Sequence, residues 1–93
     1  MSIYVDSYFA PYGRMQMCHM IADSLEELHT MADRIGVDRR WFQATASFPH
    51  YDVCKSKREL AIKFGTIPLG KRDFVAKIKI LRKNFCRHEV RPV

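Results

Sequence analysis

The 93-residue sequence lacks the features of a membrane-spanning or exported protein. None of its apolar runs approaches the roughly 20 residues that a transmembrane helix requires. The segment from Met1 to Asp6 has neither the basic start nor the long apolar stretch of a signal peptide. We therefore expect a cytoplasmic protein that has no membrane partner.

Cysteine, glycine and proline are also scarce, with three cysteines, four glycines and four prolines. So few cysteines, and an odd number of them, predict free thiols rather than a disulfide framework. Neither Cys18-His19 nor Cys86-x-His88 has the ligand spacing of a structural zinc module, so we predict no metal site and no cofactor. The glycines form neither a phosphate-binding loop nor a dinucleotide-binding pattern, and the motifs of the common hydrolases are absent. No single motif in the sequence is therefore enough to predict an activity.

The sequence does contain enough apolar residues for one folded domain. Hydrophobic residues make up 47% and aromatic residues 12% of the chain, which is typical of a globular protein rather than a disordered one. A chain of this length buries only a modest core. A homodimer is therefore compatible with the composition but is not required by it.

Hydrophobic periodicity and helix-capping signals predict a single α+β domain over residues 1–86, in which a small mixed sheet of three or four strands is packed by two or three helices. A helix over 25–35 begins at the capping box Ser24–Glu27 and ends at Gly36. A second capping box, Ser56–Glu59, predicts a helix over about 57–64. The remaining expected elements are strands over 3–6, 15–21, 41–43 and 50–53, a basic helix over about 71–84, and a frayed basic tail over 87–93.

The net positive charge lies entirely in the last quarter of the chain. Residues 1–70 contain eight Lys or Arg and eight Asp or Glu, whereas residues 71–93 contain eight and two, which accounts for the whole net charge of +6. This segregation predicts an anionic partner such as RNA, DNA or a phosphorylated ligand. The expected nucleic-acid contacts, on the outer side of the third helix, are Arg72, Lys79 and Lys83.

Two alternatives to this interpretation concern the same segment. The last two helices can form a helix-turn-helix that places the basic helix in the major groove of DNA, although a turn over 65–70 that contains Pro68 is long for that motif. The basic segment can also be a solvated region that only increases solubility.

The start of the second helix is unusually basic. Helix N-termini carry a partial positive charge and favour acidic residues, yet Lys57 and Arg58 occupy the first turn expected here. An anion bound at the helix start would offset the repulsion, and His50 and Tyr51 just before it are placed to donate to the same anion. The alternative is that these long side chains simply extend into water.

Three of the four histidines, His19, His29 and His50, are candidate catalytic groups because imidazole transfers protons near neutral pH. Two histidines and an arginine can cleave a phosphodiester without a metal, since the arginine binds the anion and stabilises charge in the transition state. The alternative for each histidine is a hydrogen-bonded structural role. The expected ligand-binding residues are Arg14, Arg40, Gln43, Tyr51, Ser56, Lys57 and Arg58.

An ordered set of short motifs over residues 3–66 is similar to a known family. The motifs are Tyr4-Val5-Asp6, Gly13-Arg14, the segment from Cys18 to Asp23, Glu27-Leu28-His29, Ala32, Ile35-Gly36, Trp41-Phe42-Gln43, His50-Tyr51-Asp52, Lys57-Arg58 and Ala61-Ile62. Together they resemble a small bacterial and phage domain known only as domain of unknown function number four thousand and thirty-one. The resemblance implies no activity. Many positions of the family pattern are polar, among them Asp23 and Asp52. The resemblance therefore implies a site that contains His19, His29 and His50.

Three functions are predicted. The first is a phosphate-recognising domain that binds a nucleotide or nucleic acid through a cleft of histidine, arginine and lysine side chains. The second is an enzyme that cleaves phosphodiesters or handles phosphoryl groups at the same site without a metal. The third is a host-directed or anti-defence protein of phage or bacterial origin whose basic helix binds an acidic host protein.

Overall fold

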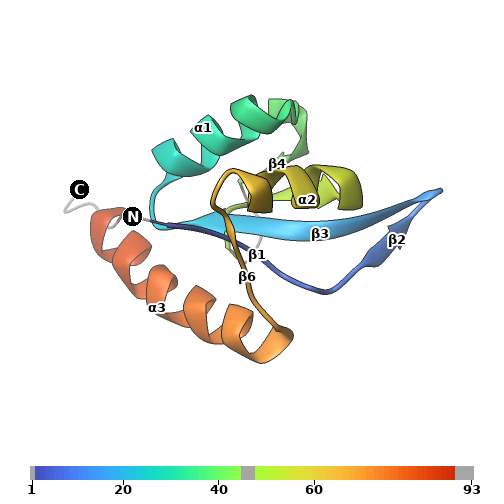
Figure 1. Cartoon of the computed structure of the whole chain (residues 1–93). Helices are drawn as coiled ribbons and strands as arrows, with labels where there is room; N and C mark the ends of the chain where they lie inside the picture. The colour runs from blue at the N-terminus through green and yellow to red at the C-terminus, as the bar shows by residue number, and fades with distance from the viewer. Residues whose placement is uncertain (1, 45–47, 90–93) are drawn as a thin grey trace.

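The computed structural model describes residues 2–44 and 48–89, apart from the side chains of Tyr12 and of residues 84–89. A central sheet has α1 (Leu25–Ile35) and α2 (Lys55–Lys63) on one face and α3 (Lys71–Glu89) on the other (Figure 1). This single α+β domain with three helices confirms the predicted fold class. Within residues 2–44 and 48–89, no helix is both long enough and apolar enough to cross a lipid bilayer.

The sheet is organised around β3 (Met15–Ala22). This strand pairs antiparallel with β1 (Ile3–Val5), β2 (Ala10–Tyr12) and β5 (His50–Cys54), and β5 in turn pairs with β4 (Phe42–Gln43). A parallel pairing joins β6 (Ile67–Pro68) to β1, so that the strand order is β4-β5-β3-β1-β6, with β2 also paired to β3. The sheet is mixed, as predicted, but the prediction of three or four strands is wrong because the described residues form six.

The additional strands are too short to produce a pattern in the sequence. β2 has three residues and β6 has two, and each contains a proline, which cannot donate to a sheet ladder and is disfavoured in strand interiors. Only their pairing with β3 and β1 makes them strands. Trp41, expected to begin a strand, instead ends a short 3₁₀ helix over Arg39–Trp41 that leads into β4.

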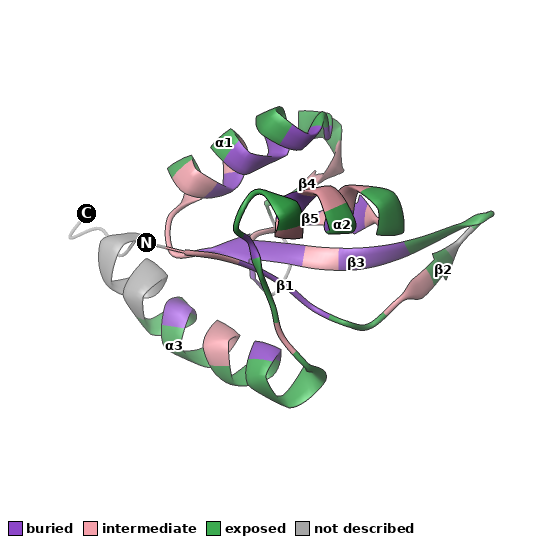
Figure 2. Ribbon diagram, in the orientation of Figure 1, coloured by how far each residue is buried: buried purple, intermediate pink, exposed green. Residues whose placement is uncertain are grey.

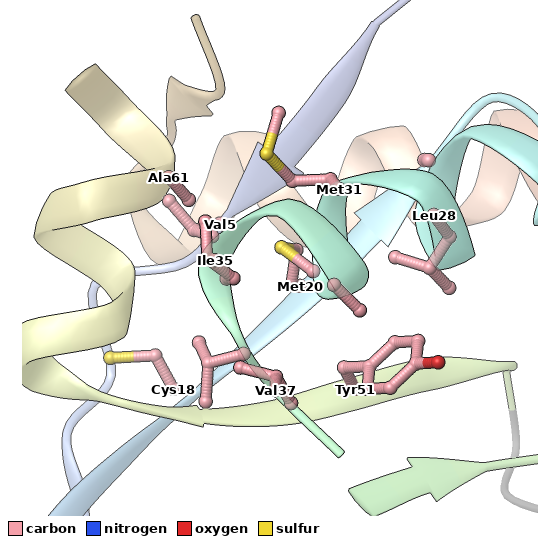
Figure 3. Packing of buried hydrophobic residues seen from close by; sticks show 12 residues of the cluster. Val5, Cys18, Met20, Leu28, Met31, Ile35, Val37, Tyr51 and Ala61 are labelled. Atoms are coloured by element: carbon pink, nitrogen blue, oxygen red, sulfur yellow. The ribbon is translucent and has the colours of Figure 1, made fainter. Parts of the chain in front are cut away.

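Side chains that alternate along β3 separate two hydrophobic clusters. Cys18 and Met20 are buried with Tyr51 against α1 and α2 (Figure 3). Ile21 faces the other way and is buried with Phe74 of α3. The buried stretch of β3 is visible in Figure 2 between the two helical layers. Because α2 and α3 pack on opposite faces, they do not form the helix-turn-helix considered from the sequence.

The three helices begin and end differently from one another. The Ser24 side chain accepts the backbone N–H of Glu27, and Gly36 ends α1 in the left-handed conformation, as predicted. The prediction that a second capping box starts α2 is wrong. The helix begins at Lys55, its N-cap residue Cys54 makes no side-chain capping hydrogen bond, and Ser56 lies inside the first turn. Helix α3 continues to Glu89, so residues 87–89 of the expected tail are helical, and residues 90–93 lie outside the described residues.

Replacing Ser24 by alanine is expected to destabilise the fold by about 1 kcal/mol, because the hydrogen bond that caps α1 is lost. Ser56→Ala is the matched control, since this exposed hydroxyl caps no helix and its removal should change the free energy of unfolding by less than about 0.5 kcal/mol. Urea denaturation followed by circular dichroism measures both values. Equal losses in the two variants would contradict the assignment of the cap to Ser24 alone.

Candidate functional site

Four polar side chains gather on the face of the sheet that carries α3. The pairing register places His19 of β3 opposite Asp52 of β5, and the two-residue period of a strand puts His50 on the same face as Asp52. Asp6 directly follows β1, and its backbone N–H donates to the backbone carbonyl of His19 at 3.1 Å. The topology therefore brings two histidines and two carboxylates from three separate segments to one place.

Asp6 holds the ring of His19 in one orientation. Its Oδ1 accepts the backbone N–H of His19 at 2.9 Å, and its Oδ2 lies 2.7 Å from Nδ1 of the ring. Because a carboxylate only accepts, Nδ1 carries the proton and Nε2 is left for another partner. The hydrogen bond from Asp6 raises the pKa of His19 above its ordinary value of 6.5, against the effect of burial and with the help of the charges of Asp6 and Asp52.

His50 is oriented by the backbone in a similar way. Its Nδ1 donates to the carbonyl oxygen of Phe48 at 2.7 Å, and its Nε2 lies 3.2 Å from Oδ1 of Asp52. The Nε2 atom of His19 is 4.0 Å from the same oxygen. The two imidazole rings meet edge to face with centroids 4.9 Å apart. Both rings thus present Nε2 to a single carboxylate oxygen.

Three atoms that can each bind a proton or a metal ion therefore converge here, namely Nε2 of His19, Nε2 of His50 and Oδ1 of Asp52. When both rings are neutral, their Nε2 atoms and Oδ1 of Asp52 repel one another unless a proton or a metal ion lies between them. One ligand atom each from His19, His50 and Asp52 can be chosen so that all three lie within 4.8 Å of one another. Ligand atoms about 2.0–2.2 Å from a tetrahedral zinc ion stand roughly 3.3–3.6 Å apart, so the widest separation in this set would have to shorten by about 1 Å around a bound ion. The three residues can therefore hold a metal ion, which the spacing along the sequence did not indicate.

A cavity of about 410 Å³ adjoins these groups. Its polar lining consists of Asp6, His19 and His50 together with the exposed Lys71 at the first residue of α3. The rest of the lining is apolar or aromatic and consists of Tyr8, Phe48, Phe74, Val75 and Ile78. A mostly apolar cavity with a few convergent polar groups is typical of a small-molecule site.

The basic first turn of α2 has partners within the fold. Arg58 is 8% exposed, its Nε donates to the backbone carbonyl of Asp6 at 2.8 Å, and its guanidinium lies 5.2 Å from the ring centroid of Phe9. The Nζ atom of Lys57 lies 3.3 Å from where a Cβ atom on Gly36 would stand. That position is beside the C-terminal end of α1, whose dipole favours a cation. Neither residue lines the cavity beside His19.

The other predicted ligand-binding residues also lie outside this cavity. Arg14 is exposed at the turn of the β2–β3 hairpin, which projects from the rest of the sheet (Figure 1). Arg40 is exposed with its guanidinium 5.6 Å from the ring centroid of Trp41, and Gln43 is exposed in β4. Ser56 is exposed 3.3 Å from the Cys54 sulfur. The predicted nucleic-acid contacts are exposed along α3, and they are Arg72, Lys79 and Lys83.

His29 and Tyr51 form a separate pair on the opposite face of the sheet. The Nδ1 atom of His29 lies 2.7 Å from the Tyr51 hydroxyl, and the His29 ring packs edge to face on Phe42 with centroids 4.6 Å apart. Burial, together with the charge of Arg39, lowers the pKa of His29 below 6.5, although Asp33 opposes this. The structure therefore brings together two of the three predicted catalytic histidines and places the third across the sheet.

Two residues of this site, Asp6 and Lys71, were not singled out from the sequence as site residues, and Asp52 was named only through the resemblance. The alternation over 50–53 does place His50 and Asp52 on one face, so this pair could have been found. Cys18 is next to His19 in the sequence but points into the opposite layer, where burial raises the pKa of its thiol to about 11. The side chains of Cys86 and His88 lie outside the described residues.

A family model described as a protein of unknown function (DUF4031) matches residues 3–81. The match confirms the resemblance and extends it beyond residue 66, so that it includes the part of α3 that lines the cavity. No curated protein and no solved structure matches the chain.

Replacing Asp6 by asparagine is expected to lower the pKa of His19, because the carboxylate that favours the charged ring is removed. In the wild type the pKa of folded His19 lies above the unfolded value near 6.5. Its contribution to stability is therefore complete below about pH 6.5 and is lost as the pH rises through the folded pKa. In Asp6→Asn this loss should be smaller. NMR titration of the imidazole C–H signals and urea denaturation at several pH values measure the two effects.

His29 is the internal control for this titration, since it lies across the sheet and its pKa should not change. A His19 titration curve that is the same in both proteins would show that Asp6 does not control the ring.

Proposed function

The chain belongs to the DUF4031 family, and we propose that it binds a divalent transition-metal ion at His19, His50 and Asp52 and uses that ion to bind a phosphate-bearing ligand. One observation supports this more than any other. Both imidazoles present Nε2 to the same oxygen of Asp52, while both Nδ1 atoms are engaged elsewhere.

The partners of the two Nδ1 atoms are those that metal-binding histidines commonly have. Such histidines donate their other ring N–H to a carboxylate or a backbone carbonyl, which fixes the ring and increases the basicity of the ligating nitrogen. His19 has the carboxylate of Asp6, and His50 has the carbonyl of Phe48. Imidazole and carboxylate ligands suit ions such as Zn²⁺ and Fe²⁺. Three protein ligands leave at least one coordination position open for an external ligand.

The charges around the cavity also favour a metal ion as the group that binds phosphate. Without an ion, the carboxylates of Asp6 and Asp52 would repel a phosphate. A divalent ion offsets both negative charges, and Lys71 adds a positive charge on the cavity lining. The proposal therefore keeps the phosphate ligand expected from the sequence and replaces the arginine and lysine cleft by a metal ion and Lys71.

We propose hydrolysis of a phosphate ester as a second function of this centre. A metal ion held by His19, His50 and Asp52 would supply a water of lowered pKa as the nucleophile. Attack by that water oxygen on phosphorus would break the ester P–O bond, and the leaving oxygen would take a proton from solvent. His19 and Asp52 also line a second hollow of about 140 Å³ beside Trp41, which gives water a separate approach to the same residues.

Metal-free protein is expected to bind one Co²⁺ ion, and the visible absorption spectrum should be that of a cobalt ion with a low coordination number. Zn²⁺ should displace this ion. Asp6→Asn should weaken binding by about 10–100-fold, because the partner that orients His19 is lost. His19→Ala, His50→Ala and Asp52→Ala should weaken it further, since each removes a ligand. Spectroscopic titration and calorimetry measure these affinities.

Two variants serve as matched controls in the same titration. His29→Ala removes a histidine from the other face of the sheet, and Cys54→Ser removes a partly exposed thiol; both should bind Co²⁺ as the wild type does. Unchanged Co²⁺ affinity in His19→Ala and His50→Ala would overturn the metal centre. Cleavage of bis(p-nitrophenyl) phosphate without metal, lost in those two variants, would instead favour the metal-independent enzyme predicted from the sequence.

A further inference from the structure

We infer that the ligand is a nucleoside monophosphate unit, whose phosphate binds the metal ion and whose base packs on Tyr8 in the adjoining cavity. The inference rests on the proposed function for the position of the phosphate. It adds the identity of the organic part of the ligand, which is inferred from the apolar lining of the cavity.

Two large side chains on this cavity are left open to water. Tyr8 is 59% exposed and Val75 is 44% exposed, although both line the cavity beside the buried Phe48 and Phe74. A ligand that covered them would remove apolar surface from water. Tyrosine also offers a flat ring face, on which another planar ring stacks favourably. These residues therefore favour a ligand with an aromatic ring over one that is polar throughout.

The same cavity connects this apolar lining to the metal ligands. His19 and His50 line it together with Tyr8 and Val75, and its volume of about 410 Å³ can hold a small organic molecule. A ligand that uses the whole cavity needs an anionic group for the ion and Lys71 and a planar group for Tyr8. A nucleoside monophosphate has both, joined by a sugar, whereas inorganic phosphate would leave the apolar residues uncovered.

A nucleoside monophosphate unit can be a free nucleotide or the end of a nucleic-acid strand. The cavity lining contains Lys71 of α3 but none of the cations on the outer side of that helix, which are Arg72, Lys79 and Lys83. The cavity alone therefore provides contacts for one nucleotide. A strand would need these outer cations in addition, and an experiment can separate the two sources.

Calorimetry of the Co²⁺-loaded protein with adenosine monophosphate, ribose 5-phosphate and adenosine tests the inference. Adenosine monophosphate should bind about fivefold or more tightly than ribose 5-phosphate, since base stacking contributes on this scale, and more tightly than adenosine, which lacks the phosphate. Tyr8→Ala should weaken its binding by about the same factor, whereas Tyr8→Phe should retain it. Phe64→Ala is the matched control, because Phe64 is an exposed aromatic residue outside the cavity lining. The Co²⁺ absorption of the same samples reports the state of the metal centre.

Each outcome decides between the two proposals. Cobalt binding without a preference for adenosine monophosphate over ribose 5-phosphate would overturn the inferred ligand and leave the metal centre intact. Nucleotide binding that is sensitive to Tyr8→Ala but independent of cobalt would support the nucleotide and overturn the proposal that the metal ion binds its phosphate. Absence of both would overturn both. A short oligonucleotide that binds more tightly than the mononucleotide, and loses this advantage when Arg72, Lys79 and Lys83 are replaced by glutamine, would identify a strand end as the source.

Discussion

The two hydrogen bonds that the Asp6 carboxylate accepts from His19 connect parts of the chain that would otherwise be independent. Asp6 follows β1, and its carboxylate holds both the backbone and the ring of His19 in the neighbouring strand. Its backbone carbonyl accepts Nε of Arg58 from α2. A buried guanidinium on one side of the sheet is therefore linked through a single aspartate to an imidazole on the other.

The sheet performs two tasks because its strands are exposed to different environments on their two faces. Along β3, the residues on either side of His19 are buried under α1 and α2, while His19 itself reaches the cavity. In β5, Tyr51 and Val53 are core residues, while His50 and Asp52 belong to the site. A shift of one residue in either pairing would exchange core and site residues. The packing of the core residues therefore also fixes the positions of the polar residues that alternate with them.

Much of the helical structure could be predicted from local signals, whereas the site depends on long-range pairing. The helix over 25–35 is marked by Ser24, Gly36 and an apolar stripe that agree with one another, so its bounds were correct. β2 and β6 carry no such signal, since their pairing with β3 and β1 alone makes them strands. His19 and His50 were recognised by residue type, but their meeting at Asp52 follows from the β3–β5 register. Arg58 was expected to contact a phosphate because it lies near a helix start, and only the tertiary fold reveals the carbonyl that it binds.

The placement of α3 sets an order in which the site is completed as the chain is synthesised. Asp6, His19, His50 and Asp52 all precede α2, whereas Lys71, Phe74, Val75 and Ile78 come from the last helix of the fold. A nascent chain that has left the ribosome as far as β5 already holds every candidate metal ligand, but the cavity has no α3 wall until that helix emerges and packs on the sheet. Translation therefore separates the appearance of the candidate metal ligands from the completion of the cavity beside them.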